Sequence, residues 1–192
     1  FDLPGPTFRS DMATDYKANR SPMPPDLAEQ IPWVHEACEA LGVPILTFER
    51  FEADDVIGTL AEKAVGAGFD VAIVTGDKDF FQLVHDGITV YNPKEDGTWF
   101  DADGVKEKFG VAPAQVVDVL ALMGDSVDNI PGVRGVGPKT AAALLEHFDN
   151  LDNIYTRLDE VAAVAVRGAA KLGARLAEHR EMAMMSRQLS TI

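Results

Sequence analysis

Eight carboxylates in the first 130 residues have the type and spacing for metal chemistry. They are Asp2, Glu52, Asp54, Asp55, Asp77, Asp79, Asp125 and Asp128. Anions gathered at one place repel one another and hold protons unless cations compensate them. No equal set of lysines and arginines is interleaved with these acids, so a hard divalent cation is the natural compensation. The pattern therefore predicts a site for two or more Mg²⁺ or Mn²⁺ ions, which can drive the hydrolysis of a phosphodiester.

Ordinary structural roles would also account for these acids. The cluster at residues 52–55 could favour the N-terminus of a helix, and Asp77 and Asp79 could form a turn. A shared site is favoured only if the fold brings the clusters together.

The elements expected around the clusters give a reason for that convergence. Apolar runs at 44–48, 69–75 and 88–91 predict strands, and the periodicity of 52–67 predicts a helix between the first two. This alternation predicts an α/β fold with a largely parallel sheet and flanking helices. Sites in such sheets form at the carboxyl ends of the strands, where the clusters fall; Asp2 follows what looks like another strand end.

The rest of the chain reads mainly as helix. Leu27, Ile31, Val34, Cys38 and Leu41 form an apolar stripe that predicts an amphipathic helix starting at Asp26, which Pro32 could kink. The position of Cys38 on that stripe favours a role in the core. After residue 100, helices are expected at 103–109, 112–123 and 139–148, followed by Ala-, Leu- and Arg-rich helix.

A glycine-rich hairpin precedes the helix at 139–148. Its glycines permit a tight turn and close approach of the backbone to a ligand, and the next helix offers its N-terminal amides to an anion. A contact with nucleic-acid phosphate fits this stretch, and a plain hairpin between helices is the alternative. A dinucleotide fingerprint is disfavoured because no strand precedes the stretch, and the glycines, lysine and threonine do not have the spacing of a P-loop. The residues singled out are Gly132, Arg134, Gly135, Gly137, Lys139 and Thr140.

A short basic stretch near the N-terminus is the third candidate. Lys17 and Arg20 share a face if the segment is helical, and Tyr16 could stack on a base. Taken alone, the segment would be read as an ordinary surface helix.

The charge of the chain argues at first against nucleic acid. The 192 residues carry 17 Lys and Arg against 31 Asp and Glu, a net charge of −14. Residues 1–130 hold 24 acids and 9 bases, whereas residues 131–192 hold 7 acids and 8 bases. This difference predicts an α/β core at 1–130 and a duplex-binding region at 131–192, within one structural unit.

Cys38 alone forms no internal disulfide, which fits a reducing cytoplasm, and no apolar run is long enough for a membrane span.

Four motifs together resemble the 5′-nuclease family, the flap endonucleases and 5′–3′ exonucleases. They are the stretches at 16–20, 52–58, 75–79 and 123–141, which occur in family order, and the last is long and specific. Within the family, the likeness is strongest to the N-terminal exonuclease domain of bacterial DNA polymerase I. The resemblance covers nearly the whole chain.

The resemblance implies a PIN-like α/β nuclease core with a helical arch and a helix–hairpin–helix clamp on duplex DNA. It implies one metal group of Asp2, Glu52, Asp54 and Asp55, and a second of Asp77, Asp79, Asp125 and Asp128. Lys17 and Arg20 match basic residues that contact the scissile phosphate, and Tyr16 matches an aromatic residue near the cleaved junction. The hairpin residues match the duplex contact, where K⁺ can also bind.

The substrate implied is DNA with a 5′ flap, nick or branch, processed during replication and repair by a monomer in the bacterial cytoplasm at the nucleoid. Polymerase domains could follow the chain. The family has a strand and an acidic turn before the position that matches Asp2, so we expect that segment to be missing from this sequence. A branched-DNA binder without catalysis, and a related metal-dependent ribonuclease, are the alternatives.

Overall fold

The computed structural model describes all 192 residues. The α-helices are α1 (Phe8–Met12), α2 (Pro25–Ala40), α3 (Ala53–Gly66), α4 (Ala102–Phe109), α5 (Val116–Met123), α6 (Pro138–Phe148), α7 (Leu151–Thr156), α8 (Ala169–Glu178) and α9 (Arg180–Ser190). Three short 3₁₀ helices are η1 (Lys78–Leu83), η2 (Pro113–Gln115) and η3 (Leu158–Ala163). The strands are β1 (Val71–Val74), β2 (Ile88–Asn92) and β3 (Thr98–Phe100).

The sheet has three strands in the order β1-β2-β3, and it is mixed. β1 pairs with β2 in parallel, with Val71 opposite Ile88, and β2 pairs with β3 antiparallel, with Val90 opposite Phe100. The expectation of a largely parallel sheet is therefore only half right. A short turn joins β2 to β3, and such a connection can return the chain only in the antiparallel direction.

Residues 44–48 do not form the predicted strand. Their backbone lies next to no strand of the sheet, and the carbonyl of Leu46 instead accepts from the N-terminal amine of Phe1 at 3.1 Å. An apolar run needs a ladder partner to become a strand, and the described chain provides none here.

Helix α2 forms as one unbroken helix through Pro32, starting at Pro25 rather than at Asp26. It contains no buried residue, so its apolar stripe does not pack into a core, and Cys38 is only half-buried. The expected core role of Cys38 is therefore wrong in this structure, because nothing covers the stripe.

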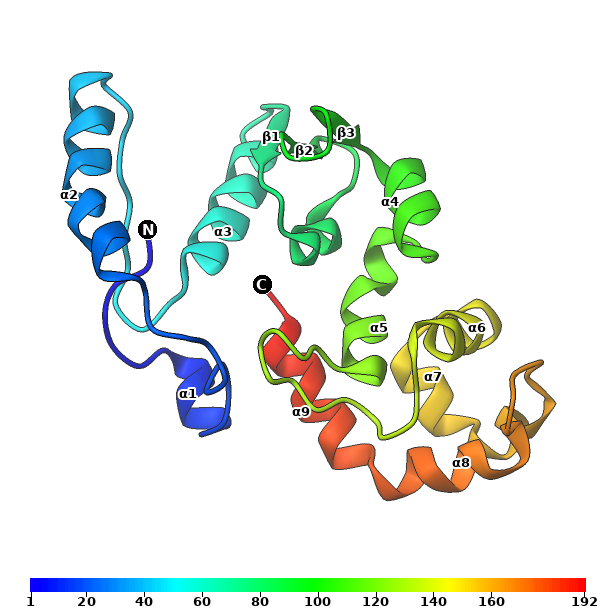
Figure 1. Cartoon of the computed structure of the whole chain (residues 1–192). Helices are drawn as coiled ribbons and strands as arrows, with labels where there is room; N and C mark the ends of the chain where they lie inside the picture. The colour runs from blue at the N-terminus through cyan, green and yellow to red at the C-terminus, as the bar shows by residue number, and fades with distance from the viewer.

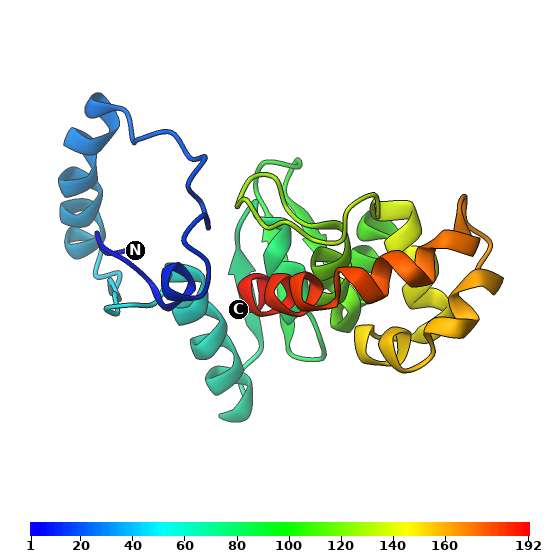
Figure 2. The same ribbon diagram turned by 90° about the horizontal axis from the view of Figure 1, so that it is seen from below.

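The hydrophobic core lies almost entirely in the second part of the chain. Thirty buried apolar residues form it, of which only Ala61 and Ile73 precede residue 75. The chain curves, with α1 to α3 on one side, the sheet at one end and α4 to α9 on the other side (Figure 1). The C-terminus lies between the two sides, as the view from below also shows (Figure 2).

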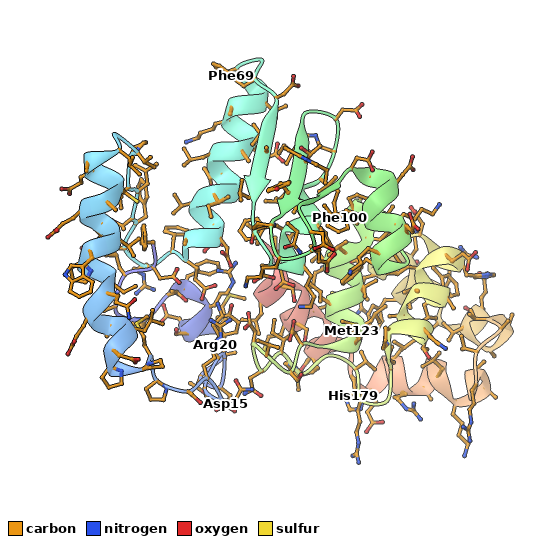
Figure 3. The ribbon with its side chains drawn as sticks, turned by 45° about the horizontal axis from the view of Figure 1, so that its top comes forward. Asp15, Arg20, Phe69, Phe100, Met123 and His179 are labelled. Carbon is orange, nitrogen blue, oxygen red and sulfur yellow. The ribbon has the colours of Figure 1, made fainter.

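Apolar side chains are exposed mainly in the first part of the chain. Of the 19 exposed large apolar residues, 16 lie within residues 1–74, including Trp33 on α2 and Phe69 before β1. Figure 3 shows Phe69 at the outer end of the α3–β1 connection, away from the packed helices. Strand β1 is an edge strand of the sheet, with the side chain of Val74 largely exposed. This side of the molecule has the composition of a packing surface.

The chain between α5 and α6 forms the expected long hairpin. Asp125 and Ile130 form an isolated antiparallel bridge with N–H···O distances of 2.9 and 2.7 Å. The loop then packs on α9, where the Gly132 amide donates to Ser186 Oγ at 3.0 Å. A Cβ on Gly132, which has a φ of +60°, would lie 2.2 Å from the backbone nitrogen of Gly124, so only glycine fits.

Candidate active site

The start of α3 holds one group of carboxylates. The Asp55 carboxylate accepts from the Glu52 amide at 2.9 Å, which fixes the first turn of the helix. Asp2 reaches the same turn from the N-terminus and accepts from the Ala53 amide at 2.6 Å. The helix, rather than a strand end, therefore positions this group, because the preceding run at 44–48 is not a strand.

Arg9 compensates part of this group from a fully buried position. Its guanidinium donates to both oxygens of Asp55 at 2.7 and 2.8 Å, and lies 3.4 Å from Glu52. It also donates to the backbone carbonyls of Leu189 and Thr191 at 2.9 and 2.5 Å. Arg9 therefore ties α1, α3 and the end of α9 together, and it occupies both oxygens of Asp55.

The second group of carboxylates surrounds Lys78. The ammonium donates to Asp79 at 3.0 Å and to Asp125 at 2.5 Å. Burial raises the pKa of Asp79 despite this lysine. Burial also acts to raise the pKa of Asp125, but the hydrogen bonds from Lys78 and the Val127 amide, together with the charge of Lys78, outweigh it and the pKa is lowered. Asp77 follows β1 and accepts from the Asp79 amide at 3.0 Å, as the sequence pattern predicts for a turn.

The basic stretch lies against the loop that carries Asp128. The Lys17 amide donates to the Asp128 carbonyl at 2.9 Å, and Asn129 Nδ2 donates to the Asp15 carbonyl at 2.6 Å. The segment forms turns and is not a helix, because Lys17 takes a left-handed φ of 55°. Figure 3 shows Asp15 and Arg20 at this junction between the two parts of the molecule.

These turns direct the basic side chains at the carboxylates. Lys17 Nζ lies 2.8 Å from Glu52 and 3.7 Å from Asp128, while Arg20 donates to Asp128 at 2.5 Å. The Tyr16 hydroxyl donates to Glu52 at 3.1 Å. The structure thus brings Tyr16, Lys17 and Arg20 to the acidic groups, although their predicted roles toward phosphate and base stay predictions.

Asp54 is one of the acids that no side-chain cation pairs with, and it is half-buried. Burial raises its pKa to about 6, and the neighbouring charges of Asp77, Glu52 and Asp2 act in the same direction. The charge of Lys17 acts in the opposite direction and lowers the pKa. A half-buried carboxylate surrounded by other carboxylates is what a divalent cation would relieve.

The donor set fits a metal ion in chemistry and only partly in arrangement. No three Asp, Glu, His or Cys side chains lie close enough together here to hold an ion. Arg9, Lys17, Arg20 and Lys78 pair with five of the eight acids, so the protein's own cations supply part of the compensation that the sequence pattern assigns to metal. Asp2, Asp54 and Asp77 have no such partner.

A polar cavity of about 450 Å³ opens at this place. Thr75, Gly76 and Lys94 line it together with Arg20 and the acids Asp77, Asp79, Asp125 and Asp128. Acids from two segments and exposed bases therefore face one cavity, which is the geometry of a site for a charged substrate.

The hairpin residues divide into buried and accessible ones. Gly132 is buried, and its observed role is to let the loop cross Gly124 closely. Arg134, Gly135 and Lys139 are exposed, and Gly137 has open space around the place of a Cβ. The exposed residues can reach a ligand, and their contact with DNA stays a prediction.

Sequence reasoning missed Arg9, Lys78 and Lys94. The signal for Lys78 was present, since it stands between two of the acids. Arg9 carries no such signal, because its partner Asp55 lies 46 residues away and Leu189 lies 180 residues away.

This chain belongs to the 5′–3′ exonuclease family. Residues 1–110 match the family model "5′-3′ exonuclease, N-terminal resolvase-like domain", and residues 111–192 match "5′-3′ exonuclease, C-terminal SAM fold". Together the two matches span the chain and confirm the recognised family, with a PIN-like core followed by a helical domain. The charge distribution predicts a division of the chain at residue 130 instead, and that division stays a prediction.

Curated relatives support the same assignment. The chain is 53% identical over its whole length to DNA polymerase I of Pseudomonas aeruginosa, and it covers 21% of that protein. It is 41% identical to a 5′-3′ exonuclease of Buchnera aphidicola, of which it covers 63%. The chain thus spans about a fifth of the polymerase relatives and less than two thirds of the shorter exonuclease.

Solved structures share the fold. T5 5′-exonuclease with bound zinc superposes with a TM-score of 0.78 at 25% identity, over 98% of this chain and 71% of that one. The catalytic core of Rad2 in complex with DNA superposes with a TM-score of 0.58 at 18% identity, over 98% of this chain and 62% of the other. The second likeness shows the fold alone.

Proposed function

We propose that this protein is a metal-dependent, structure-specific 5′-nuclease that hydrolyses phosphodiesters at DNA 5′ flaps and 5′ ends. The observation that carries the proposal is one cavity where Arg20 and Lys94 face Asp77, Asp79 and Asp125. Membership of the 5′–3′ exonuclease family supports it, as do the zinc ions bound to T5 5′-exonuclease.

The acids without a side-chain cation, Asp2, Asp54 and Asp77, are the first candidates to hold Mg²⁺ or Mn²⁺, and Glu52 lies beside them. A second ion would use Asp79, Asp125 and Asp128, after Lys78 and Arg20 release them. When bound, two such ions stabilise the charge that develops during phosphodiester hydrolysis. Asp55 is a weaker candidate, because Arg9 occupies both of its oxygens.

The chain's own cations would position the DNA. Lys17 and Arg20 are held at the edge of the site by backbone contacts to the loop at 125–130, and their charged ends can move from a carboxylate to a phosphate. Tyr16 stands beside them and presents an aromatic ring for a terminal base. Charge neutralisation of the acids by metal lowers their repulsion of phosphate, so binding near the site is stronger with metal.

The hairpin would hold the duplex next to the flap through backbone and basic contacts that do not depend on sequence. Its accessible part is formed by Arg134, Gly135, Gly137, Lys139 and Thr140, and a K⁺ ion at the loop carbonyls belongs to the same proposal. The wider setting is a monomer that acts on nicked, flapped or branched DNA in replication and repair. The place of action is the bacterial cytoplasm at the nucleoid. No helix of the structure has the length and apolar character for a membrane crossing.

A further strand completes this proposal. The free edge of β1 and the exposed apolar residues of 1–74 would pack against an additional apolar strand of the nuclease core. Such a strand would also give residues 44–48 a partner and could bring another acid to the site.

Cleavage of a labelled 5′-flap duplex in Mg²⁺ tests the proposal, with Asp77→Asn and Asp125→Asn combined in one variant. We expect cleavage by the wild-type sequence, loss in EDTA, and a loss of more than about 100-fold in the double variant. Glu160→Gln, on η3 and not among the residues that line the cavity, is the matched control for removal of one acid. Cleavage that survives both EDTA and the double substitution contradicts a metal mechanism.

One observation favours a second candidate, a branched-DNA binder without catalysis. Five of the eight acids are already neutralised by arginine or lysine, and no three of them converge on a metal position. This candidate predicts flap binding in EDTA and no turnover after Mg²⁺ or Mn²⁺ is added. Metal-dependent turnover by the same preparation excludes it.

A further inference from the structure

A second polar pocket lies beside the hairpin, outside the carboxylate site. Arg134 and Gly135 of the loop line it, together with Arg175, Glu178 and His179 at the end of α8. Its volume is about 370 Å³, and it has no apolar lining residue. Figure 3 shows His179 where α8 meets α9, on the same lower edge of the molecule as the hairpin.

The conformation of the loop places backbone directly against Arg175. Gly135 has a φ of +79°, and a Cβ there would lie 2.9 Å from Arg175 Nη1. Helix α8 fixes the position of the Arg175 backbone, because Leu172 and Leu176 on the same helix are buried in the core. A glycine at 135 thus leaves room for a positioned guanidinium at the pocket.

Neither arginine of the pocket has an ion-pair or hydrogen-bond partner in the protein. In contrast, Arg9, Arg20, Arg50, Arg157 and Arg187 all pair with carboxylates. Arg167 and Arg180 also have no such partner, but neither lines this pocket, where two unpaired guanidinium groups come together. Their planar donor sets match the oxygens of a phosphate, which accepts two hydrogen bonds from one guanidinium.

We propose that Arg175 and Arg134 bind a backbone phosphate of the duplex and so extend the grip of the hairpin onto α8. This inference rests on the proposed function, because it assumes that a duplex lies on the hairpin. The negative charge of Glu178 lowers the affinity of the pocket for a single free anion. A phosphate of a duplex can still bind there, because neighbouring contacts hold the duplex at the same time.

Binding of a labelled 5′-flap duplex in EDTA, measured by fluorescence anisotropy at several salt concentrations, tests the inference without turnover. We expect Arg175→Ala to weaken binding about tenfold and to lower the salt slope by about one. Lys171→Ala, which removes an exposed charge one turn earlier on α8, is the matched control, with a loss below about twofold. Arg175→Lys should fall between them, because an ammonium lacks the planar donor set.

Glu178→Gln serves as a second variant, because a gain in DNA affinity cannot result from misfolding. It removes the exposed acid of the pocket, so binding should tighten by about two- to fivefold at low salt. Equal losses for Arg175→Ala and Lys171→Ala, or no gain for Glu178→Gln, overturn the inference. Inorganic phosphate alone is the last arm: saturable, Arg175-dependent binding below about 1 mM identifies a free-anion site and also overturns it.

The two proposals fail in different ways. If the wild type cleaves flap DNA and Arg175→Ala binds it with unchanged affinity, the nuclease proposal is supported and the phosphate-pocket proposal is contradicted. Cleavage that survives EDTA and the double variant of Asp77 and Asp125 removes the metal mechanism, while a tenfold loss for Arg175→Ala still supports the pocket.

Discussion

Residues 1–74 and residues 75–192 are held in place by different forces. The second region contains 28 of the 30 core residues, and its hairpin and helices are set by close apolar packing. The first region exposes most of its large apolar side chains. It joins the rest of the molecule through the β1–β2 ladder and two core residues, Ala61 and Ile73, and its segments before α3 join it through charged groups. At the site, closely packed elements therefore meet α1 and the turns at 15–20, which ion pairs position, and the geometry of that junction depends most on the charged contacts.

The largest effect is expected at the buried contact that joins the two regions. Arg9→Met should destabilise the fold by about 3–5 kcal/mol, because it leaves Asp55 and Glu52 buried without their partner. Urea unfolding measures the change. Arg50→Met is the control, since the Arg50–Asp11 pair is exposed and should contribute less than about 1 kcal/mol. Equal effects for the two arginines would show that the first region is not held by charge.

A smaller effect is expected from apolar truncation, and here the regions should differ sharply. Leu144→Ala in α6 removes a fully buried side chain and should cost about 2–5 kcal/mol. Leu27→Ala in α2 removes a side chain that is 45% exposed, with an expected cost within about 0.5 kcal/mol. Thermal unfolding of both variants gives the comparison. A cost at Leu27 as large as at Leu144 would mean that α2 packs on something in solution.

The smallest effect concerns Asp54 and depends on pH. Its pKa of about 6 lies above the ordinary value of 3.8, so the stability it contributes is fully present below pH 4 and is lost as pH rises through 6. Without metal, Asp54→Asn should therefore be more stable than the wild type at pH 7, by about 1–3 kcal/mol. At pH 4 the two should converge. Unfolding in EDTA at pH 4, 5, 6 and 7 checks this, and a pH-independent difference would contradict it.

The sequence predicts the local elements of both regions well. The helices at 52–67 and 103–109 appear within two residues of their expected bounds, because helical periodicity and capping are local signals. The strand at 44–48 does not appear, since a strand depends on a partner that periodicity cannot supply. β3 was missed because three residues are too few for a visible alternation.

The sequence predicts which acids approach one another, but not which cations pair with them. The acids of 52–55, 77–79 and 125–128 do approach one another, as the motifs indicate. Their partners could not be read from spacing, because Arg20 reaches Asp128 across 108 residues and Arg9 reaches Asp55 across 46. Such contacts are fixed by the fold and leave no periodic trace in the sequence.

Helix α9 sets the spacing between the hairpin and the carboxylate site, because both are attached to it. Ser186 receives the hairpin through the Gly132 amide, and a few residues further on the carbonyls of Leu189 and Thr191 receive Arg9 beside the acids. Leu189 lies three residues and Thr191 five residues after Ser186, an axial rise of roughly 5–8 Å along the end of the helix. If the hairpin holds the duplex, the distance from the end of the duplex to the scissile bond is set by the protein. The position of a cut would then follow from the shape of the DNA junction, whatever its sequence.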